Sequence, residues 1–326
     1  MTWHEFTGSA EAWDQLVIRL GASTPFQLSA WSAFRESFGW RCLRLVTADF
    51  TSAVCLLVKS MGPVSVAWGP GAPLGAVDAV TLRELPTDAK LLLHAKVLYL
   101  RVADQGPLVA SRVEAFQLAG WLSPATPLGG NKTLVRSLDI SSPLSTSYSS
   151  NWSRNLRRGH QRKINATLWL HPDSETIARL HRDVENLKKP FHAGWRSDRK
   201  AVAQVLAAFG NGVVTVRAHD TTGETLAIRA ATLVGTNAFD FLAATSHEGR
   251  KNYASNVALD ALLTALVSRG ITRYDFGGVD EIHNRGVFDF KHGAGGEHLS
   301  YNGEFETTVP KTLHQVVAKL ISSRLN

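Results

Sequence analysis

A cluster of cations is the part of this sequence best suited to chemistry with an anionic partner. Between Asn151 and Leu170 the chain has no Asp or Glu, and close to Trp152 it carries Arg154, Arg157, Arg158, Arg162 and Lys163. Such side chains neutralise phosphates, and an aromatic ring beside them can stack on unpaired bases. The segment therefore suits phosphate contacts and stacking on an unpaired nucleotide. A solvated helix face is the structural alternative.

Metal-dependent and serine-nucleophile chemistry are not expected from the motifs. Histidines such as His283, His292 and His298 are numerous, but no Cys-x-x-Cys or His-Glu-x-x-His spacing occurs. A Gly-x-Ser-x-Gly elbow is also lacking. Cys42 and Cys55, the two cysteines, lie in apolar stretches and are interpreted as packing residues.

Length and composition favour two domains. The chain has 326 residues, is 44% hydrophobic and carries a formal net charge of +7, which is compatible with an anionic partner without proving one. The sequence contains no apolar run of about 18 residues, and its first residues do not resemble a signal peptide. We therefore expect a cytoplasmic protein without a transmembrane segment.

The first half of the chain predicts helices and strands in a mixed order. Trp13, Leu16, Val17 and Leu20 have helical spacing before Gly21. Further elements are expected as a helix at 28–37, strands at 42–46, 53–58 and 64–68, a turn at 69–73, a helix at 85–95 and a strand at 97–102.

A comparable order recurs in the second half. Strands are expected at 213–218, 225–233, 238–243 and 272–276, with a helix before the last one. Leu259, Leu262, Leu263 and Leu266 share one face of that helix, for which Ser255 is the expected N-cap and Gly270 the stop. The two halves look like variants of one α/β unit.

The Ser-rich stretch 141–150 predicts a linker between the halves, and Pro310 predicts the start of a last helix. That helix has Leu313, Val316 and Val317 on one face. The expected domains are residues 1–148 with 310–326, and residues 149–309.

Residues 274–296 carry the most specific motif. Tyr-Asp-Phe-Gly-Gly starts at Tyr274, Phe-Lys follows at Phe290 and Lys291, and a Gly-rich turn ends at Gly296. This pattern resembles the C-terminal part of the FemABX family of aminoacyl-tRNA-dependent peptidyltransferases. Upstream segments resemble the family in the same order, at Pro25-Phe26-Gln27 with Trp31 and Arg35, at Trp68-Gly69-Pro70, and at Asn151–Arg158.

The resemblance implies a fold of α/β (α+β) class, with two tandem GNAT-like domains that have mixed central sheets. It also implies that the last helix returns to the first domain, which would bind the acceptor, while the second domain would bind the charged tRNA. The long coiled-coil arm of some relatives is absent, so the chain is more similar to the compact FemX form.

Site residues follow from the same resemblance. Lys291, next to Phe290, occupies the position at which the family's lysine stabilises the oxyanion; a solvated lysine at a strand end is the alternative. Asp104 corresponds to an active-site aspartate of the family, or else is an ordinary turn residue. Acceptor contacts are implied for Arg35, Trp31, Arg196 and Phe241. At Lys200, Phe239 and Phe241 the family often has tyrosines, so the acceptor side departs from the usual pattern.

The implied reaction joins the aminoacyl group of a charged tRNA to an amine of a peptide acceptor, without a metal or redox cofactor. The acceptor is open between a nucleotide-linked peptidoglycan precursor and a free or carrier-bound peptide, as for the alanyltransferase of pacidamycin-type antibiotic assembly. We expect a monomer.

An acyl-CoA-dependent N-acyltransferase of the same fold is the main alternative. Its pyrophosphate loop would fall at 247–255, where Tyr253 replaces the expected glycine. A nucleic-acid-binding module without catalysis ranks third, because it would leave the Phe-Lys motif unexplained.

Overall fold

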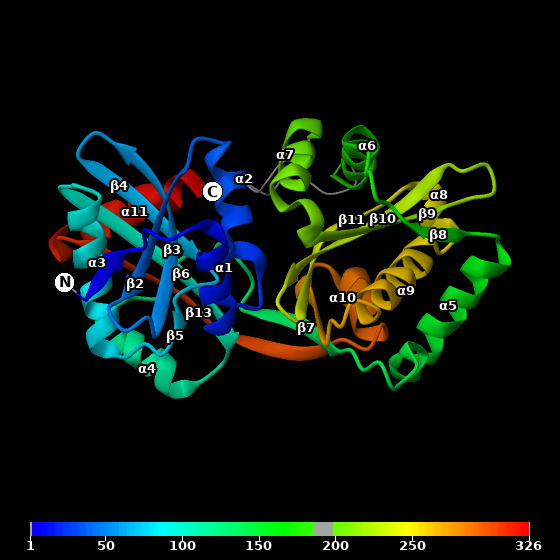
Figure 1. The fold of residues 1–326 in the computed structure, drawn as a ribbon, viewed down its shortest axis with the longest axis horizontal. Helices are drawn as coiled ribbons and strands as arrows, with labels where there is room; N and C mark the ends of the chain where they lie inside the picture. The colour runs from blue at the N-terminus through cyan, green and yellow to red at the C-terminus, as the bar shows by residue number, and fades with distance from the viewer. Residues whose placement is uncertain (1, 186–197, 326) are drawn as a thin grey trace. The chain divides into compact units, whose positions relative to one another are not determined.

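The computed structural model describes the backbone of residues 2–185 and 198–325 and the side chains of residues 2–182 and 198–319. It divides into two compact units (Figure 1), of which unit 1 comprises Met1–Lys132 with Leu299–Asn326 and unit 2 comprises Thr133–His298. Each unit is built on a mixed sheet with helices, so the expected α/β class is confirmed. Within the described residues no helix is long and apolar enough to cross a membrane.

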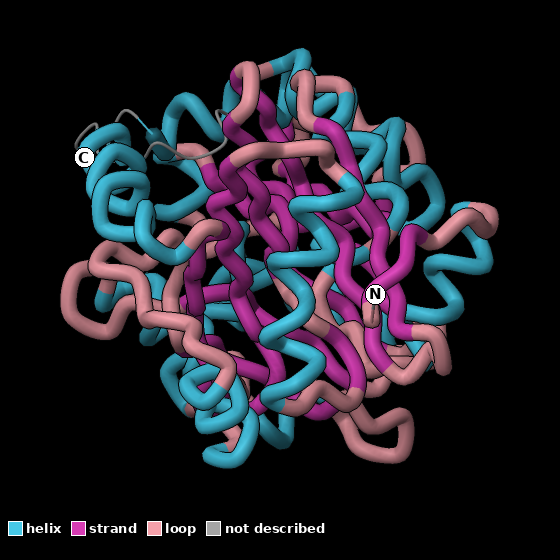
Figure 2. The backbone as a smooth tube through the Cα atoms, turned by 90° about the vertical axis from the view of Figure 1, so that its left-hand side faces the viewer, coloured by secondary structure: helices cyan, strands magenta, loops and turns pink. Residues whose placement is uncertain are grey.

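Unit 1 has its sheet in the order β1-β2-β3-β4-β6-β13, with the short β5 beside β3. Among the described strands of this unit, only β4 and β6 form a parallel pair. In Figure 2 its strands, drawn in magenta, lie side by side with a helix crossing in front of them. The elements are β1 (Trp3–Glu5), α1 (Ala10–Arg19), α2 (Ser29–Glu36), β2 (Arg41–Thr47), β3 (Ser52–Met61), β4 (Val64–Pro70), β5 (Leu74–Gly75), α3 (Ala79–Leu92), β6 (Val97–Pro107), α4 (Ala110–Leu118), β13 (Glu297–Val309) and α11 (His314–Leu325).

Strand alternation gives the two faces of the unit 1 sheet different chemistry. Leu98, Leu100 and Val102 of β6 lie in the apolar core with Phe116 of α4. Arg101, which lies between them in sequence, points to the opposite face and is nevertheless buried. One face of this sheet is therefore an ordinary core, whereas the other carries buried charge.

Unit 2 repeats this architecture in the order β7-β12-β11-β10-β9-β8, with β11–β12 as its parallel pair. The recurrence of the element order is thus observed in the structure. The elements are β7 (Lys132–Ser137), α5 (Ser150–Gln161), β8 (Asn165–Leu168), α6 (Ser174–Glu185), α7 (Arg199–Phe209), β9 (Val213–His219), β10 (Thr225–Val234), β11 (Asn237–Thr245), α8 (His247–Lys251), α9 (Ala254–Val267), β12 (Arg273–Gly278) and α10 (Arg285–Gly293).

Helices cover both faces of the unit 2 sheet. On one face Leu259, Leu262 and Leu266 of α9 pack in a core that contains Tyr274 and Phe276 of β12. On the other face residues of α6 and α7 pack against Ile228, Ala230 and Leu242. Helices therefore cover both faces of the sheet. The ends of its strands are where a ligand site can form.

The two parallel pairs differ in how far they stay together. In unit 1, β4 and β6 remain paired along the whole of Val64–Pro70 against Val97–Ala103. In unit 2, β11 and β12 pair only over Asn237–Phe239 against Arg273–Asp275 and then separate. Because ligands of α/β folds bind where neighbouring strands diverge at their carboxyl ends, unit 2 offers the open crevice.

Some element boundaries differ from those expected. The units meet at 132/133 and 298/299, not at 148/149 and 309/310, because β7 pairs with β12 inside unit 2 while most of β13 pairs with β6 of unit 1. Ser255 is not the N-cap of α9: Tyr253 is, and the Ser255 hydroxyl lies 2.5 Å from that of Thr245. Helix α3 starts earlier than expected, because the Asp78 side chain caps it.

Candidate functional site

A cavity of about 860 Å³ opens in unit 2 where β11 and β12 separate. Its walls come from the ends of these strands, from the turn between α8 and α9, and from α10. Pockets of this size are typical of sites for small molecules or for one end of a larger ligand. This crevice contains the motif residues that the sequence singled out.

Lys291 reaches this cavity from α10 and not from a strand end. Its side chain is only 9% exposed, and its Nζ donates to the carbonyl oxygens of Gly278 at 2.9 Å and Gly277 at 3.3 Å. A buried ammonium is stable only when dipoles or charges surround it. The alternative of a solvated lysine is therefore wrong, and the cation is held at a fixed position in the cavity wall.

The carbonyls that hold Lys291 are themselves positioned by a bulge. Opposite Val135 and Thr133 of β7, strand β12 has an irregular register between Asp275 and Gly278. Gly277 has φ +71° there, a conformation that favours glycine. The Asp275 carboxylate accepts the Gly277 N–H at 2.8 Å and a short hydrogen bond from the Thr133 hydroxyl. Gly277 and Gly278 of the motif thus allow the strand to turn its carbonyl oxygens toward Lys291.

Phe290 lies next to a buried ion pair on the floor of the cavity. Arg229 Nη1 and Asp240 Oδ2 are 2.5 Å apart, and both side chains are at most 10% exposed. The Arg229 guanidinium lies 5.0 Å from the centre of the Phe290 ring. Burial and the charge of Asp240 raise the pKa of the nearby Tyr274 phenol well above its usual value. The Arg229–Asp240 ion pair therefore holds the ring of Phe290, the residue before Lys291, in place.

Phe241 also lines this cavity. It is the extra residue of a bulge, because Leu242 pairs with Ala230 whereas Asp240 pairs with Ala231. A bulge turns the side chain of the inserted residue away from the regular alternation. Its ring lies 5.6 Å from that of Phe209.

The turn before α9 is occupied by Tyr253. This residue has φ +61°, which is uncommon for a residue other than glycine, and it lines the cavity. Arg158 Nη1 lies 3.2 Å from its hydroxyl, and the Arg162 guanidinium lies 5.1 Å from its ring centre. In an acyl-CoA enzyme this turn would approach the pyrophosphate. Here an aromatic ring and two arginines fill it.

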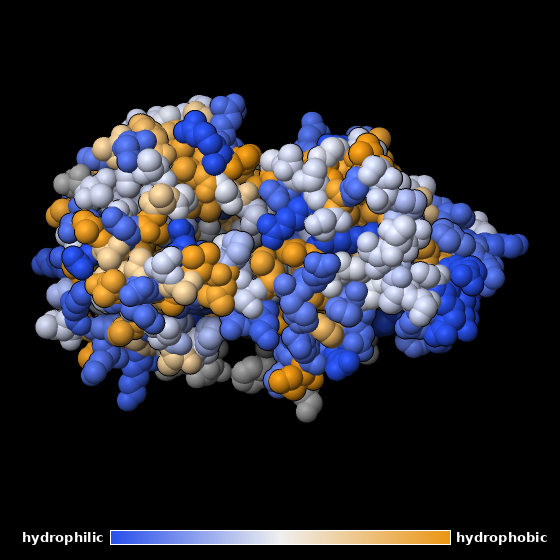
Figure 3. All heavy atoms as spheres, turned by 90° about the horizontal axis from the view of Figure 1, so that it is seen from below, coloured by the Kyte–Doolittle hydropathy of each residue, from blue (hydrophilic) through white to orange (hydrophobic). Residues whose placement is uncertain are grey.

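The basic segment is a helix followed by an edge strand. Arg158 of α5 and Arg162, the residue that follows α5, lie at the cavity rim, where Arg162 also donates to Asn252 Oδ1 at 3.2 Å. Arg154, Arg157 and Lys163 are exposed. Figure 3 shows a continuous hydrophilic surface at the right-hand end, where Figure 1 places α5. All five expected cations are thus exposed, and two of them, Arg158 and Arg162, also contact residues of the cavity rim.

Asp104 lies in unit 1, in the wall of a second cavity of about 610 Å³. It is 2% exposed, forms a short ion pair with Arg112, and accepts from Gly106 N and Asn302 Nδ2, each at 3.0 Å. It is thus a buried and saturated carboxylate, not a solvated turn residue. Asp104 and Lys291 belong to different units.

The other residues expected to bind the acceptor lie in α2 of unit 1 or outside the described residues. Arg35 packs its guanidinium over the rings of Trp31 at 5.8 Å and Trp40 at 5.1 Å, and burial lowers its pKa. Neither Arg35 nor Trp31 lines the unit 1 cavity, although Phe26, which does, lies 5.0 Å from Trp31. Arg196 lies outside the described residues.

Sequence reasoning missed the Arg229–Asp240 pair. Its residues lie on adjacent strands, eleven positions apart, and neither occupies a recognised motif. The signal available was a charged residue inside each of two otherwise apolar strand patterns, because unpaired charge is rarely buried in a sheet. As for metals, no group of three or more ligating side chains occurs among the described residues.

Comparisons with known proteins agree with this architecture. The model of the FemAB family matches residues 193–321. The solved structure of FemX is 13% identical, with a TM-score of 0.80 over 97% of this chain and all of that one. A tandem GNAT protein from the clavulanic acid biosynthesis pathway is 13% identical, with a TM-score of 0.56 over 94% of this chain and 98% of that one. No curated protein matches by sequence.

Proposed function

We propose that this chain, a protein of the FemAB/FemX family, transfers the aminoacyl group of a charged tRNA to an amine of a peptide acceptor. The observation that carries the proposal is the buried cation of Lys291, fixed beside Phe290 in the open crevice of unit 2. An aminoacyl ester is already activated, so the protein has to orient the two reactants and stabilise charge.

In the proposed step the acceptor amine attacks the ester carbonyl. A C–N bond forms, the ester C–O bond breaks, and the terminal ribose oxygen of the tRNA leaves with a proton that originates from the amine. Negative charge develops on the carbonyl oxygen in between. The Lys291 ammonium would stabilise that oxygen by about 3–4 kcal/mol, the scale measured for one oxyanion donor. We expect no metal or redox cofactor to take part.

The tRNA would approach along α5, with Arg154, Arg157 and Lys163 on its phosphates. Arg158, Arg162 and Tyr253 form the rim between this helix and the cavity. Unit 1, which contains Asp104, Arg35 and Trp31, would receive the acceptor, either a peptidoglycan precursor or a peptide of a biosynthetic pathway that is free or carrier-bound. We further propose that the protein is cytoplasmic and acts as a monomer.

Acyl transfer from acyl-CoA remains the second candidate, because a tandem GNAT protein shares the fold. Tyr253 argues against it, since its side chain stands in the turn where a pyrophosphate would need close access to the backbone. Binding of acyl-CoA would require a residue with a shorter side chain at position 253.

The test incubates the full chain with a mixture of radiolabelled aminoacyl-tRNAs and peptide acceptors. We expect label to enter peptide, and we expect prior ribonuclease treatment to abolish the transfer. Label transfer from acetyl-CoA that is indifferent to ribonuclease would instead support the second candidate and refute the first.

A further inference from the structure

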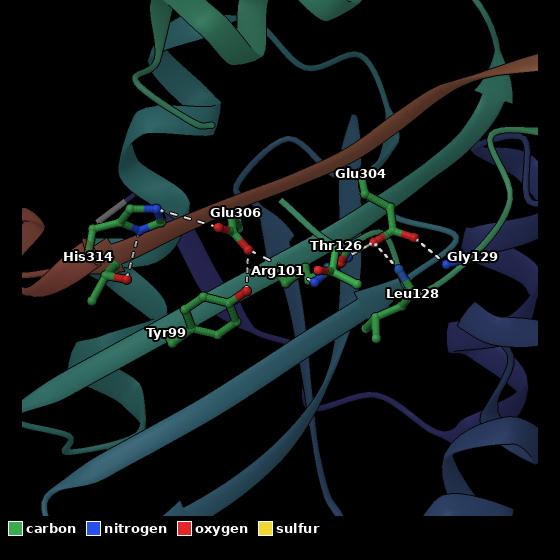
Figure 4. Close-up of polar contacts among 9 residues, drawn as sticks. Tyr99, Arg101, Thr126, Leu128, Gly129, Glu304, Glu306 and His314 are labelled. Atoms are coloured by element: carbon green, nitrogen blue, oxygen red, sulfur yellow. Dashed lines mark hydrogen bonds and ion pairs between the residues drawn. The ribbon is translucent and has the colours of Figure 1, made fainter. Parts of the chain in front are cut away.

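Buried arginines of the two units differ in what balances their charge. Arg101 lies beside Glu304 (Figure 4) and donates to its carboxylate at 2.8 Å, and Arg229 pairs with Asp240. Arg136 of β7 is only 4% exposed, but among the described residues no carboxylate lies in ion-pair contact with it. A buried charge without a counter-ion is costly unless dipoles surround it. The groups that hold Arg136 are therefore important.

Two backbone carbonyls and one ring hold the Arg136 guanidinium. Nη1 donates to the carbonyl oxygen of Ala294 at 2.7 Å, and Nη2 donates to that of Leu144 at 2.5 Å. The centre of the Tyr148 ring lies 4.8 Å from the guanidinium carbon. Ala294 is the C-cap residue of α10, whereas Leu144 and Tyr148 precede α5. The Arg136 side chain therefore joins the end of α10 to the Ser-rich segment that leads into α5.

Four successive carbonyls at the end of α10 have partners outside the helix. A helix cannot satisfy its last four carbonyls by itself. Three of them accept from backbone N–H groups, those of Lys291 from Gly296 at 3.2 Å, His292 from Gly295 at 2.9 Å and Gly293 from Ser149 at 2.9 Å. Arg136 is the donor to the fourth, at Ala294. A cation at this end of a helix is also favoured by the helix dipole.

The Gly-rich turn after α10 leaves room for these contacts. Gly295 has φ +87°, and a Cβ there would lie 2.8 Å from Cβ of Ser147 and 3.4 Å from Nε of Arg136. A larger residue would therefore push the turn away from the segment before α5. The last part of the sequence motif thus keeps the end of α10 within reach of Arg136.

The opposite end of α10 has less support. Asn284 occupies the N-cap position, but its side chain makes no capping hydrogen bond. Arg285, Gly286 and Val287 of the first turn are exposed. Lys291 lies in the last turn, at the end that Arg136 anchors. Because the anchored end carries Lys291, that anchor determines where the lysine side chain starts.

We propose that Arg136 is a positioning residue that acts through Lys291. It fixes the C-terminal end of α10, so that the Lys291 Nζ meets the carbonyl oxygens of Gly277 and Gly278 in the cavity wall. The inference rests on the proposed function in giving Lys291 a catalytic role. Arg136 is not among the residues that line the cavity, so it does not act on a substrate directly.

The kinetic test compares three substitutions. Arg136→Met leaves the carbonyls of Ala294 and Leu144 without their donor, and the resulting shift of α10 should lower kcat by about tenfold or more with little change in KM. Arg136→Lys keeps the charge and can bond one carbonyl, so it should retain more turnover. Arg217→Met is the control, because Arg217 of β9 lies over Trp169 and not beside α10. It should keep wild-type turnover.

A double-mutant cycle with Lys291→Met separates positioning from a general loss of structure. If Arg136 acts through Lys291, Arg136→Met should lower kcat by less than about twofold when residue 291 is already methionine. A general loss of structure would lower kcat by the same factor in both backgrounds. Equal factors in the two backgrounds would overturn the inference, and so would full turnover in both Arg136 variants.

Chemical modification of Lys291 tests the inference without tRNA. The folded chain is treated briefly with acetic anhydride, and the modified fraction of Lys291 is measured by mass spectrometry. The nearly buried amine should react slowly in wild type and in Arg217→Met, and faster in Arg136→Met and Arg136→Lys. Arg136→Lys retains the buried charge and gives the answer if Arg136→Met does not fold. Equal rates in the folded proteins would refute the role of Arg136.

The two measurements distinguish this inference from the proposed function. If no charged tRNA supports transfer but Lys291 reacts faster in the Arg136 variants, the proposed function fails and the fixing of Lys291 by Arg136 stands. If transfer occurs and neither kcat nor the modification rate responds to Arg136, the positioning role fails and the function stands.

Discussion

The Nζ of Lys291 lies 2.9 Å from the carbonyl oxygen of Gly278, so α10 and the end of β12 are joined by a cation in the crevice wall. The contact is nearly buried, which strengthens its electrostatic effect relative to that of a surface lysine. It places one positive charge at the point where β11 and β12 separate.

Lys291→Met should lower turnover by about a hundredfold or more, because the substitution removes the charge offered to the oxyanion and keeps the length of the side chain. Turnover is measured with a saturating charged tRNA, and tRNA affinity separately by filter binding, which should persist. Lys96→Met, at an exposed lysine between α3 and β6, is the control. Full activity in Lys291→Met would remove this residue from the mechanism.

Gly277→Ala should reduce both stability and turnover. The φ of +71° costs an alanine about 1 kcal/mol, and relaxation of the turn would shift the carbonyl that holds Lys291. Gly270→Ala is a close control, because Gly270 has φ +75° and open space around a new Cβ. We expect similar losses in the free energy of unfolding, with reduced turnover only in Gly277→Ala. Equal turnover in the two variants would contradict the positioning role.

Breaking the Arg229–Asp240 pair should be strongly destabilising. Arg229→Met leaves the buried Asp240 carboxylate without its partner, which costs about 3–5 kcal/mol. Adding Asp240→Leu should restore much of that loss, because no isolated charge remains buried. Chemical denaturation of the two single variants and the double variant gives the coupling energy. Additive losses would show that the two side chains do not depend on each other.

Unit 2 should lose stability in alkali through Tyr148. Burial and then the charge of Asp260 raise the pKa of this phenol above its ordinary value of 10.0, and its hydroxyl donates to Asp260 at 2.8 Å. A raised folded pKa gives stability that is complete below the unfolded pKa and is lost as the pH rises above about 10. Tyr148→Phe should therefore be less stable than wild type at neutral pH and lose less between about pH 9 and pH 11. Parallel losses would rule out this source of alkali sensitivity.

Arg157→Gln should lower the salt dependence of tRNA binding by about one unit of the log-log slope, because an exposed cation has been removed from α5. Its thermal stability should be unchanged. Arg162→Gln should lower the slope and also destabilise the rim, because Arg162 contacts Asn252 and the Tyr253 ring. An unchanged slope in both variants would argue against α5 as the tRNA surface.

Local pattern was sufficient for much of the fold. The helical spacing of Leu259, Leu262 and Leu266 and the apolar strands on either side of it predicted the second α/β unit, and all three leucines are buried in α9. The Phe-Lys motif pointed to a residue that is in fact buried in a cavity wall. Such patterns can be recognised in the sequence because a helix or strand that packs on one core along its whole length has apolar residues at regular spacing.

The unpredicted parts depend on contacts between segments far apart in sequence. Strand β7 was not expected, since Lys132–Ser137 becomes a strand through pairing with β12. The boundaries of the two compact units depend on the same kind of long-range strand pairing. Nothing local indicates that Glu304 meets Arg101, or that Tyr253 adopts a left-handed conformation next to the guanidinium groups of Arg158 and Arg162. Tertiary context decides such features.

The pairing of β13 with β6 has a consequence for biosynthesis on the ribosome. Unit 2 is one continuous stretch, whereas unit 1 needs Leu299–Asn326 to complete its sheet. Unit 2 can therefore finish folding first, although it is translated second. Until the last residues emerge, the edge of β6 that β13 later covers has unpaired backbone groups, the kind of edge that recruits foreign strands. A nascent chain stopped before Leu299 should for that reason be a strong client for chaperones.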